Sequence, residues 1–315
     1  MTSIIAQSVG VDISKDTLDI HLHPADATQR LPNSPAGIKK LVSWLGGFTV
    51  DRIVFEPTGS YHHRLERSLG EAGLPLVKVN PRQARRFAEV IGRQAKTDAV
   101  DAAMLARFGA LIQPPARPMI SQALDEMKEL HIARRALVKD RVAAQNREQI
   151  RRSSLLKRQA AERLKQIDRQ ITAIDVELHS ILDADAALKA RFDILMSIPG
   201  VGDVTAITII VEMPELGMID NKAVASLAGL APIARDSGAY RGKRFIRGGR
   251  ADLRQALYMP ALVAVRHNAS MKAKYQACIE AGKPPKVALT AIMRKLLILA
   301  NALIRDARTW TPTLA

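Results

Sequence analysis

The chain has 315 residues, 47% of them hydrophobic, and its 47 Lys and Arg against 31 Asp and Glu give a formal net charge of +16. This length allows two domains with a connector, and the excess of positive charge is typical of proteins that bind nucleic acid. Because no run of about 18 apolar residues occurs and the first residues lack the positive segment of a signal peptide, we expect a cytoplasmic protein with no membrane partner. The single cysteine, Cys278, cannot form an internal disulfide, which fits a reducing compartment.

The first region, from residue 4 to about residue 110, alternates short apolar runs with helical patterns. Strands are predicted at SVGVDIS, TLDIHLH, RIVFE and PLVKV, and helices at residues 36–45 and 62–72. Such alternation favours an α/β sheet domain, which we assign to residues 1–113. The following QPPARP segment ends this domain because its prolines cannot continue a helix.

The second region has the pattern of a long helix, because residues 121–183 contain neither Gly nor Pro. Apolar residues recur there at steps of three and four. They are Leu164, Ile167, Ile171, Ile174, Leu178 and Ile181. This is the spacing of a coiled-coil seam, so residues 119–190 are predicted to form a helical connector that pairs with a coiled-coil partner and drives homo-oligomerisation.

The third region, residues 191–315, is predicted to be mostly helical. It opens with SIPGVG at residues 197–202 and carries a segment rich in Gly and Arg at residues 235–250. SIPGVG resembles the turn of a helix-hairpin-helix module, whose backbone N–H groups hold a phosphate. A helix start shaped by Pro and Gly explains the same residues equally well. Helices are predicted at residues 204–213, 253–265 and 285–306.

Four acidic residues of the α/β domain are candidate metal ligands. Asp12 lies among apolar residues of the first predicted strand, where an acid is disfavoured, and Glu56 ends the strand RIVFE. Asp98 and Asp101 are three residues apart on a predicted helix, where like charges repel unless a cation lies between them. Such carboxylates could hold two divalent ions about 4 Å apart for phosphoryl transfer. From the residues alone, a solvated acidic pair relieved by neighbouring Lys and Arg is equally compatible.

Two further groups of the α/β domain are candidates for binding. The basic run RQARRFAEVIGRQAK leads directly into the acid pair and could hold a nucleic-acid backbone. Its candidate residues are Arg82, Arg85, Arg86 and Lys96. His62 and His63 follow the Glu56 segment and are a weaker candidate for contact with metal or phosphate, since histidines on a helix face often have no chemical role.

Seven pieces of the sequence resemble one family. GVDISKDTLDIHL, FEPTGSY and KTDAVDAAMLA are similar to the three signatures of the DEDD-type insertion-sequence transposases. SIPGVG, LAGLAP, DSGAYRGK and LRQALYMPALVA resemble the C-terminal transposase domain of that family, which also occurs in Piv-type DNA invertases. The pieces are in order and span nearly the whole chain. The resemblance implies an N-terminal domain of the RNase H or RuvC fold, and DNA transposition by strand exchange.

The resemblance also implies the site residues. The family's metal acids correspond to Asp12, Glu56, Asp98 and Asp101, which implies two Mg²⁺ ions, with Mn²⁺ as a substitute. The serine that attacks DNA in the family corresponds to Ser237. Nearby basic residues that could bind the scissile phosphate are Arg235, Arg241, Lys243, Arg244, Arg247 and Arg250. From the residues alone, a turn with a phosphate-binding loop is the simpler interpretation of this segment, because no general base is evident beside the serine.

The partners implied by the resemblance are donor and target DNA and a structured noncoding guide RNA. It further implies a dimer or tetramer in which the acids of one subunit meet the serine of another. A junction-resolving nuclease, the main alternative, would use the four acids alone, with Ser237 and the basic region only for binding. An inert RNA-binding scaffold would have no need of intact acids. GVDISKDTLD also resembles a phosphate loop of actin-like sugar kinases, but the second such loop and an adenosine site are missing.

Overall fold

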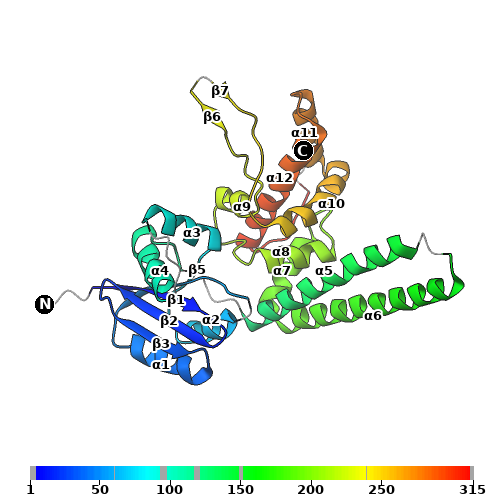
Figure 1. The fold of residues 1–315 in the computed structure, drawn as a ribbon. Helices are drawn as coiled ribbons and strands as arrows, with labels where there is room; N and C mark the ends of the chain where they lie inside the picture. The colour runs from blue at the N-terminus through cyan, green and yellow to red at the C-terminus, as the bar shows by residue number, and fades with distance from the viewer. Residues whose placement is uncertain are drawn as a thin grey trace. The chain divides into compact units, whose positions relative to one another are not determined.

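The computed structural model describes the chain except for residues 1–4, 60, 93–97, 117–120, 149–151, 239 and 313–315, and it describes residues 98 and 99 by their backbone alone. The chain divides into two units, residues 1–119 and residues 120–315. Each unit has its own hydrophobic core. Figure 1 shows the strands of the first unit and the long helices of the second.

The first unit is built on a five-stranded sheet with the strand order β3-β2-β1-β4-β5. β1 (Gln7–Ile13), β2 (Thr17–His23) and β3 (Thr28–Pro32) form an antiparallel meander. β4 (Val50–Phe55) pairs with β1 in parallel, and β5 (Leu76–Lys78) continues the parallel part. The four strands predicted from the sequence are confirmed, whereas β3 was not predicted because its short polar sequence, TQRLP, lacks an apolar run.

Helices cover both faces of this sheet. α1 (Pro35–Leu45) and α2 (His62–Glu71) pack on one face, where their leucines join Val9, Val11 and Phe55 in a buried cluster. α3 (Pro81–Val90) and α4 (Asp98–Ile112) belong to the second cluster, which contains Val54. Because side chains alternate along a strand, β4 gives its odd-numbered apolar residues to the first face and Val54 to the other. The sheet is therefore a middle layer between two helical layers.

Local sequence signals explain where two of these helices begin. The Ser34 side chain accepts a hydrogen bond from the backbone N–H of Gly37, and Pro35 follows at the first helical position. The Asn80 side chain likewise accepts from the N–H of Arg82, again with a proline next in the chain. Both starts combine a side-chain cap with a proline that has no N–H to leave unpaired. The predicted helices at residues 36–45 and 62–72 are confirmed, and α3 is an additional helix.

The second unit begins with two long helices, α5 (Gln122–Glu148) and α6 (Ser154–Ala184), which pack along each other as a hairpin (Figure 1). Ion pairs join Arg134 to Asp175 and Arg141 to Asp168, so the two helices run antiparallel. The prediction of one long helix is therefore wrong, because the chain reverses between Glu148 and Ser154.

The predicted seam of α6 packs against α5 of the same chain. Ile167 and Ile171 are buried with Ala144, and Leu178 is buried with Leu124 and Met127. An apolar stripe at steps of three and four requires a neighbouring helix but does not encode whether that helix belongs to the same chain or to another copy. The structure gives the seam an internal partner, so a role of this seam in self-association has no support from the packing.

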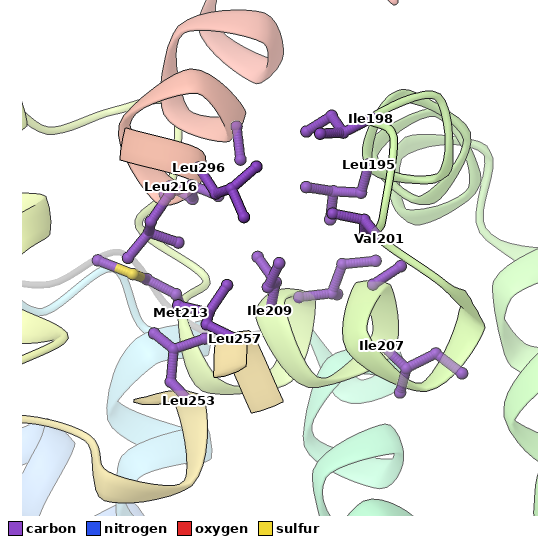
Figure 2. Close-up of a cluster of buried hydrophobic side chains, with 14 of the residues drawn as sticks. Leu195, Ile198, Val201, Ile207, Ile209, Met213, Leu216, Leu253, Leu257 and Leu296 are labelled. Atoms are coloured by element: carbon purple, nitrogen blue, oxygen red, sulfur yellow. The ribbon is translucent and has the colours of Figure 1, made fainter. Parts of the chain in front are cut away.

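The remainder of the second unit is a helical body. Its helices are α7 (Ala186–Met196), α8 (Asp203–Glu212), α9 (Asn221–Leu227), α10 (Ala251–His267), α11 (Ala269–Glu280) and α12 (Pro285–Arg305). Figure 2 shows side chains from α7, α8, α10 and α12 converging on one cluster, including Leu195, Ile209, Leu257 and Leu296. The helices predicted at residues 204–213, 253–265 and 285–306 are confirmed, whereas α7, α9 and α11 were not predicted.

Two segments of this body, α12 and SIPGVG, have sequences that the structure explains. α12 is long and apolar enough to cross a membrane by length and composition, but 50% of the qualifying window is buried, and α12 packs on α7, α9, α10 and α11. In this structure α12 is therefore a core helix of the second unit. The SIPGVG segment is the turn between α7 and α8, where Gly200 has φ +95 and a Cβ would come within 2.8 Å of the carbonyl oxygen of Pro260. Gly200 thus permits close packing of the turn on α10. Phosphate binding by this turn stays a prediction.

A small hairpin of two short strands, β6 (Asp236–Ser237) and β7 (Tyr240–Arg241), projects from the helical body (Figure 1). An isolated bridge between Ile233 and Phe245 closes its base. We call residues 231–250 the hairpin arm. Most of the described residues of this arm are exposed.

Candidate metal and nucleic-acid site

Asp12 and Glu56 lie side by side at the carboxyl ends of two parallel strands. The parallel register of β1 and β4 pairs Val11 with Phe55, so Asp12 is the next residue of β1 and Glu56 is the residue directly after β4. In α/β sheets the crevice outside the carboxyl ends of parallel strands is where ligands bind. The register thus brings two acids, 44 positions apart in the numbering, to one edge of the sheet.

Both acids belong to the face of the sheet that α4 covers. A Cβ added to Gly10 would overlap the backbone of Ala102 and Ala106, so α4 lies directly on Gly10. Val54, the register partner of Gly10, packs into the cluster that contains α4 residues. Side chains two apart on a strand share a face, so Asp12 follows Gly10 and Glu56 follows Val54 onto the α4 side.

The direction of α4 brings its acidic end to the same place. Gly109 lies against Ser8, and Ala102 and Ala106 lie against Gly10, so α4 runs opposite to β1. Two strand residues span about 6.6 Å, which is between four and five helix residues at about 1.5 Å each. Two residues further along β1, from Gly10 to Asp12, the part of α4 that lies opposite the strand is therefore its first turn. That turn holds Asp98 and Asp101.

The backbone therefore brings all four predicted acids to one edge of one sheet face. Asp12, Glu56 and Asp101 are half-buried. Asp98 starts α4, and its side chain lies outside the described part of the chain. Carboxylates are hard oxygen ligands, and divalent cations such as Mg²⁺ and Mn²⁺ prefer them. The donor set thus fits a divalent metal centre.

A fifth acid, Asp19, belongs to this neighbourhood and was not identified from the sequence. β1 and β2 pair Asp12 directly with Asp19, and directly opposed residues of antiparallel strands share a face. Asp19 is 8% exposed, and Arg30 lies 3.7 Å from one of its carboxylate oxygens. The available signal was the acid inside the apolar run TLDIHLH, which would be costly to bury without a counter-charge.

The histidines that follow Glu56 lie on the other face of the sheet. His62, His63 and Glu66 have side-chain ligand atoms within 4.8 Å of one another. However, α2 packs on the Val11 and Phe55 side, and the Lys78 ammonium is 2.7 Å from the Glu66 carboxylate. Burial first, and then the charge of Lys78, lower the pKa of His62. A resident ammonium beside the carboxylate disfavours a second cation there.

The basic run before α4 forms the exposed side of α3. Ala84 of this helix is buried, and Phe87 makes an edge contact with Phe108 of α4, with the two ring centroids 5.3 Å apart. Arg82, Arg85 and Arg86 are exposed. Lys96 lies outside the described residues. The described part of the run is therefore available to contact phosphates beside the helix that carries the acid pair.

Ser237 stands near the tip of the hairpin arm. It pairs with Tyr240 across β6 and β7, and the next residue, Gly238, has φ +54, which a tight turn allows for glycine. Asp236, which directly precedes Ser237, forms an ion pair with Arg244, with N and O atoms 2.8 Å apart. Ser237 is exposed, so its hydroxyl is accessible to a macromolecular substrate.

The predicted basic residues of the arm differ in what they contact. Arg250 makes two hydrogen bonds, of 2.8 and 2.7 Å, to the carboxylate of Glu215, so its charge is already compensated within the protein. The Arg235 guanidinium lies 4.7 Å from the ring centroid of Phe245. The remaining members, Arg241, Lys243 and Arg247, are exposed, as is the ion-paired Arg244. This surface fits phosphate binding, with Arg250 serving to anchor the arm.

The candidate residues therefore form two groups. The four acids and the α3 arginines belong to the first unit, and Ser237 with the arm belongs to the second. Acids on a sheet edge and an accessible serine among arginines are both groups that act on phosphodiesters.

Comparison with known proteins gives matches over most of the chain. Residues 9–157 match a family model of DEDD transposases of the IS110 type, and residues 192–276 match one described as the transposase IS116/IS110/IS902 family. A pilin gene-inverting protein of Moraxella bovis is 29% identical over 316 residues, covering 95% of this chain and 96% of that protein. An uncharacterized 42 kDa protein of insertion element IS900 from Mycobacterium paratuberculosis is 32% identical over 165 residues, covering 49% of this chain and 40% of the relative.

The matches and the site define the class of protein as a DNA transposase or recombinase, an enzyme whose substrate is DNA. More specifically, the chain belongs to the DEDD-type insertion-sequence transposases of the IS110/IS116/IS902 family. Membership of a family named for its acids implies dependence on a divalent metal ion, in agreement with the carboxylates on the α4 face of the sheet.

Proposed function

We propose that this transposase cleaves and exchanges DNA strands in a Mg²⁺-dependent reaction, with Ser237 as the nucleophile and Asp12, Glu56, Asp98 and Asp101 as the metal ligands. The observation that carries the proposal is the convergence of the acids: strand register and the packing of α4 on Gly10 direct them to one edge of the sheet. The strand order and the mixed pairing support assignment of the first unit to the RuvC-like fold.

Each group has a distinct part in this reaction. The acids would hold two divalent ions, which supply charge neutralisation at the attacking and leaving oxygens of the phosphodiester. The exposed arm arginines would position the phosphate beside Ser237. The Ser237 oxygen then forms a bond to phosphorus while the bond to one DNA oxygen breaks, and that oxygen leaves as a hydroxyl. Attack by a hydroxyl of another strand on the phosphoserine reverses these bonds and completes the exchange.

We further propose that the enzyme acts in the cytoplasm as a homo-oligomer, guided by a structured noncoding RNA that pairs with donor and target DNA. The net charge of +16 and the exposed basic residues of α3 and of the arm support a large polyanionic partner. The printed names of the relatives, a gene-inverting protein and a protein of an insertion element, support a role in moving or inverting a DNA segment. Sequencing of RNA that co-purifies with the protein tests the guide, since an RNA without complementarity to the recombined ends would contradict it.

The covalent intermediate provides the decisive test of the serine. Incubation with a DNA substrate that traps the intermediate should give a protein–DNA adduct on a denaturing gel, and Ser237→Ala should bind DNA but form no adduct. Ser153→Ala is the matched control, because Ser153 is exposed and its side chain makes no cap hydrogen bond. The alternative, a junction-resolving nuclease, is favoured by the completeness of the acid set: it predicts that Ser237→Ala nicks DNA at a near wild-type rate with no adduct.

Mixing two inactive variants tests whether the site is shared between subunits. If the acids of one copy serve the serine of another, Asp12→Ala mixed with Ser237→Ala restores part of the recombination activity, because one complete site forms per mixed pair. A site formed within one chain predicts no restoration, since each copy then carries one defect. Co-expression of differently tagged variants, followed by purification on both tags, gives the mixed oligomer for this assay.

A further inference from the structure

A large pocket lies between the base of the hairpin arm and the last two helices. Its volume is about 810 Å³, and its walls come from Leu230 and the arm, from α11 and α12, and from Lys283 between these two helices. Ligand pockets commonly have volumes of about 300 to 1,000 Å³. The pocket lies wholly in the second unit and includes neither the predicted metal acids nor Ser237.

The lining combines apolar residues with positively charged ones. Leu230, Phe245, Val287 and Ile298 contribute apolar surface. The charged residues that line it are Arg244, Lys274, Lys283, Arg294 and Lys295. Among the described residues that form the pocket, none is acidic. Its occupant should therefore carry both apolar faces and negative charges.

The arm side of the pocket is held in place by contacts within the protein. The Arg235 guanidinium stacks near the Phe245 ring, at 4.7 Å from its centroid, and Phe245 also pairs with Ile233 through backbone hydrogen bonds. Arg244, next to Phe245 in the chain, is tied to Asp236 by an ion pair. An aromatic ring fixed in this way is suited to contact a flat partner, because little conformational freedom is lost when the partner binds.

We propose that this pocket binds unpaired nucleotides of a nucleic-acid strand, with bases against its apolar lining residues and phosphates on its lysines and arginines. This inference rests on the proposed function, because a strand exchange exposes unpaired nucleotides. Duplex DNA presents its phosphates and groove edges but keeps its bases stacked, so it would leave the apolar lining residues without a partner. Unpaired strands offer the faces of their bases, and proteins bind them with aromatic platforms in positively charged grooves.

The test compares single-stranded and duplex oligonucleotides of the same sequence, by fluorescence anisotropy in the presence of EDTA so that no strand is cleaved. Ala291→Phe places a large side chain in the pocket, and Lys274→Gln removes one charge from its lining. The matched controls are Ala273→Phe and Lys272→Gln, which change exposed residues of α11 outside the lining. Ala291→Phe should weaken single-strand binding about tenfold or more, as expected for loss of base contacts, while duplex binding stays within about twofold.

Cys278 gives a second readout in the unmodified protein. It is the only cysteine of the chain and lines the pocket, and it is 5% exposed, so iodoacetamide should reach its thiol slowly and through the pocket, and a bound strand should slow the alkylation further. A single-stranded oligonucleotide should protect the thiol at concentrations where the duplex does not. This measurement needs no substitution and therefore decides the matter even if Ala291→Phe does not fold.

Two results would overturn the inference. One is single-strand binding by Ala291→Phe and Lys274→Gln equal to that of their controls, together with unprotected Cys278. The other is protection of Cys278 by an acidic peptide or by anionic lipid vesicles but not by single strands, which would identify a different occupant. Failure of the proposed function has a separate signature: the wild type forms no adduct on DNA, while pocket binding in EDTA persists.

Discussion

The acids and Ser237 are held by the chain in very different ways. Asp12 and Glu56 extend from strands whose neighbouring residues are buried, and the backbone of α4 rests directly on Gly10 one step away. Ser237, in contrast, belongs to a strand of two residues near the tip of an exposed arm. A group on a packed sheet cannot move without disturbing the core, whereas a group on a short hairpin can be moved at low cost.

This difference indicates a division of labour. Under the proposed function, the sheet would supply a metal-binding geometry that exists before any substrate arrives, which is the condition for electrostatic catalysis without reorganisation. Under the proposed function, the arm would supply the nucleophile, and its final position would be set by the nucleic acid that the arm arginines bind. The arm is nonetheless anchored at its base, where Arg250 is bonded to Glu215 and Arg235 stacks near Phe245.

The largest expected effect on recombination comes from removing one of the acids proposed to bind the metal ions. Asp12→Ala or Asp101→Ala should lower recombination more than about a hundredfold, because even outer-shell partners of a metal cost about ten- to a hundredfold. DNA binding should change little, since it depends on the basic surfaces. Plasmid recombination and filter binding measure the two quantities. Asp51→Ala is the control, because Asp51 lies on β4 but is exposed and paired with Arg52. An acid variant with near wild-type recombination would remove that residue from the set.

The packing that positions the acids can be broken without touching them. Gly10→Ala adds a methyl group that overlaps the backbone of α4, and overpacking of this kind costs about 1–3 kcal/mol. A displacement of catalytic groups by about 1 Å can lower the rate about a hundredfold. The recombination rate of Gly10→Ala should therefore fall by more than the loss of stability explains.

Gly47→Ala provides the comparison for this substitution. Gly47 is exposed in the same unit, and its nearest neighbour would be an ordinary 3.5 Å from the new Cβ. Urea unfolding and recombination assays, run on both variants below the unfolding transition, separate the two effects. Equal activity of Gly10→Ala and Gly47→Ala would show that α4 does not position the acids.

Acid should weaken the second unit through His131, which is 2% exposed on α5. Burial first, and then the charges of Arg135 and Arg134, lower the pKa of His131 from 6.5 to about 4. The folded state thus holds this histidine neutral while the unfolded chain takes up a proton. The full stability of the folded state is therefore present above pH 6.5. As the pH falls towards 4, the free energy of unfolding decreases by about 3 kcal/mol, because the unfolded chain binds a proton at His131 that the folded state does not.

Equilibrium unfolding between pH 7 and pH 4 measures this effect. His131→Leu should flatten the decline of stability with falling pH, because the replacement takes up no proton. His267→Leu, which changes an exposed histidine of α10, should leave the decline as it is in the wild type. Parallel pH curves for the wild type and His131→Leu would contradict the assignment.

The smallest expected effects distinguish two arginines of the arm. Arg241→Ala should reduce the dependence of the logarithm of DNA affinity on the logarithm of salt concentration by about one unit, as expected for the loss of one phosphate contact. Arg250→Ala should leave that slope unchanged and instead lower thermal stability, since it breaks the bonded pair with Glu215. Affinity titrations at several salt concentrations, together with thermal unfolding, test both. A reduced slope for Arg250→Ala would show that its charge reaches DNA.

Much of the first unit could be predicted from the sequence. Short apolar runs predicted four of its five strands, and the misplaced acid in GVDIS identified Asp12 as a candidate ligand. These signals are local, because a strand or a helix is specified by the periodicity and the end signals of its own residues. The family could also be recognised, because its motifs keep their order along the chain.

The tertiary structure decided what these residues contact. Three outcomes depended on it: the α6 seam packs on α5 of the same chain, Arg250 is bonded to Glu215, and Asp19 stands opposite Asp12. In each case the partner lies at least 7 positions away along the chain, and often much further, so no local pattern encodes it. An apolar stripe or a charge states only that a partner is required. Which partner fills the requirement follows from strand register and helix packing, and these minimise the free energy of the whole fold rather than that of any one segment.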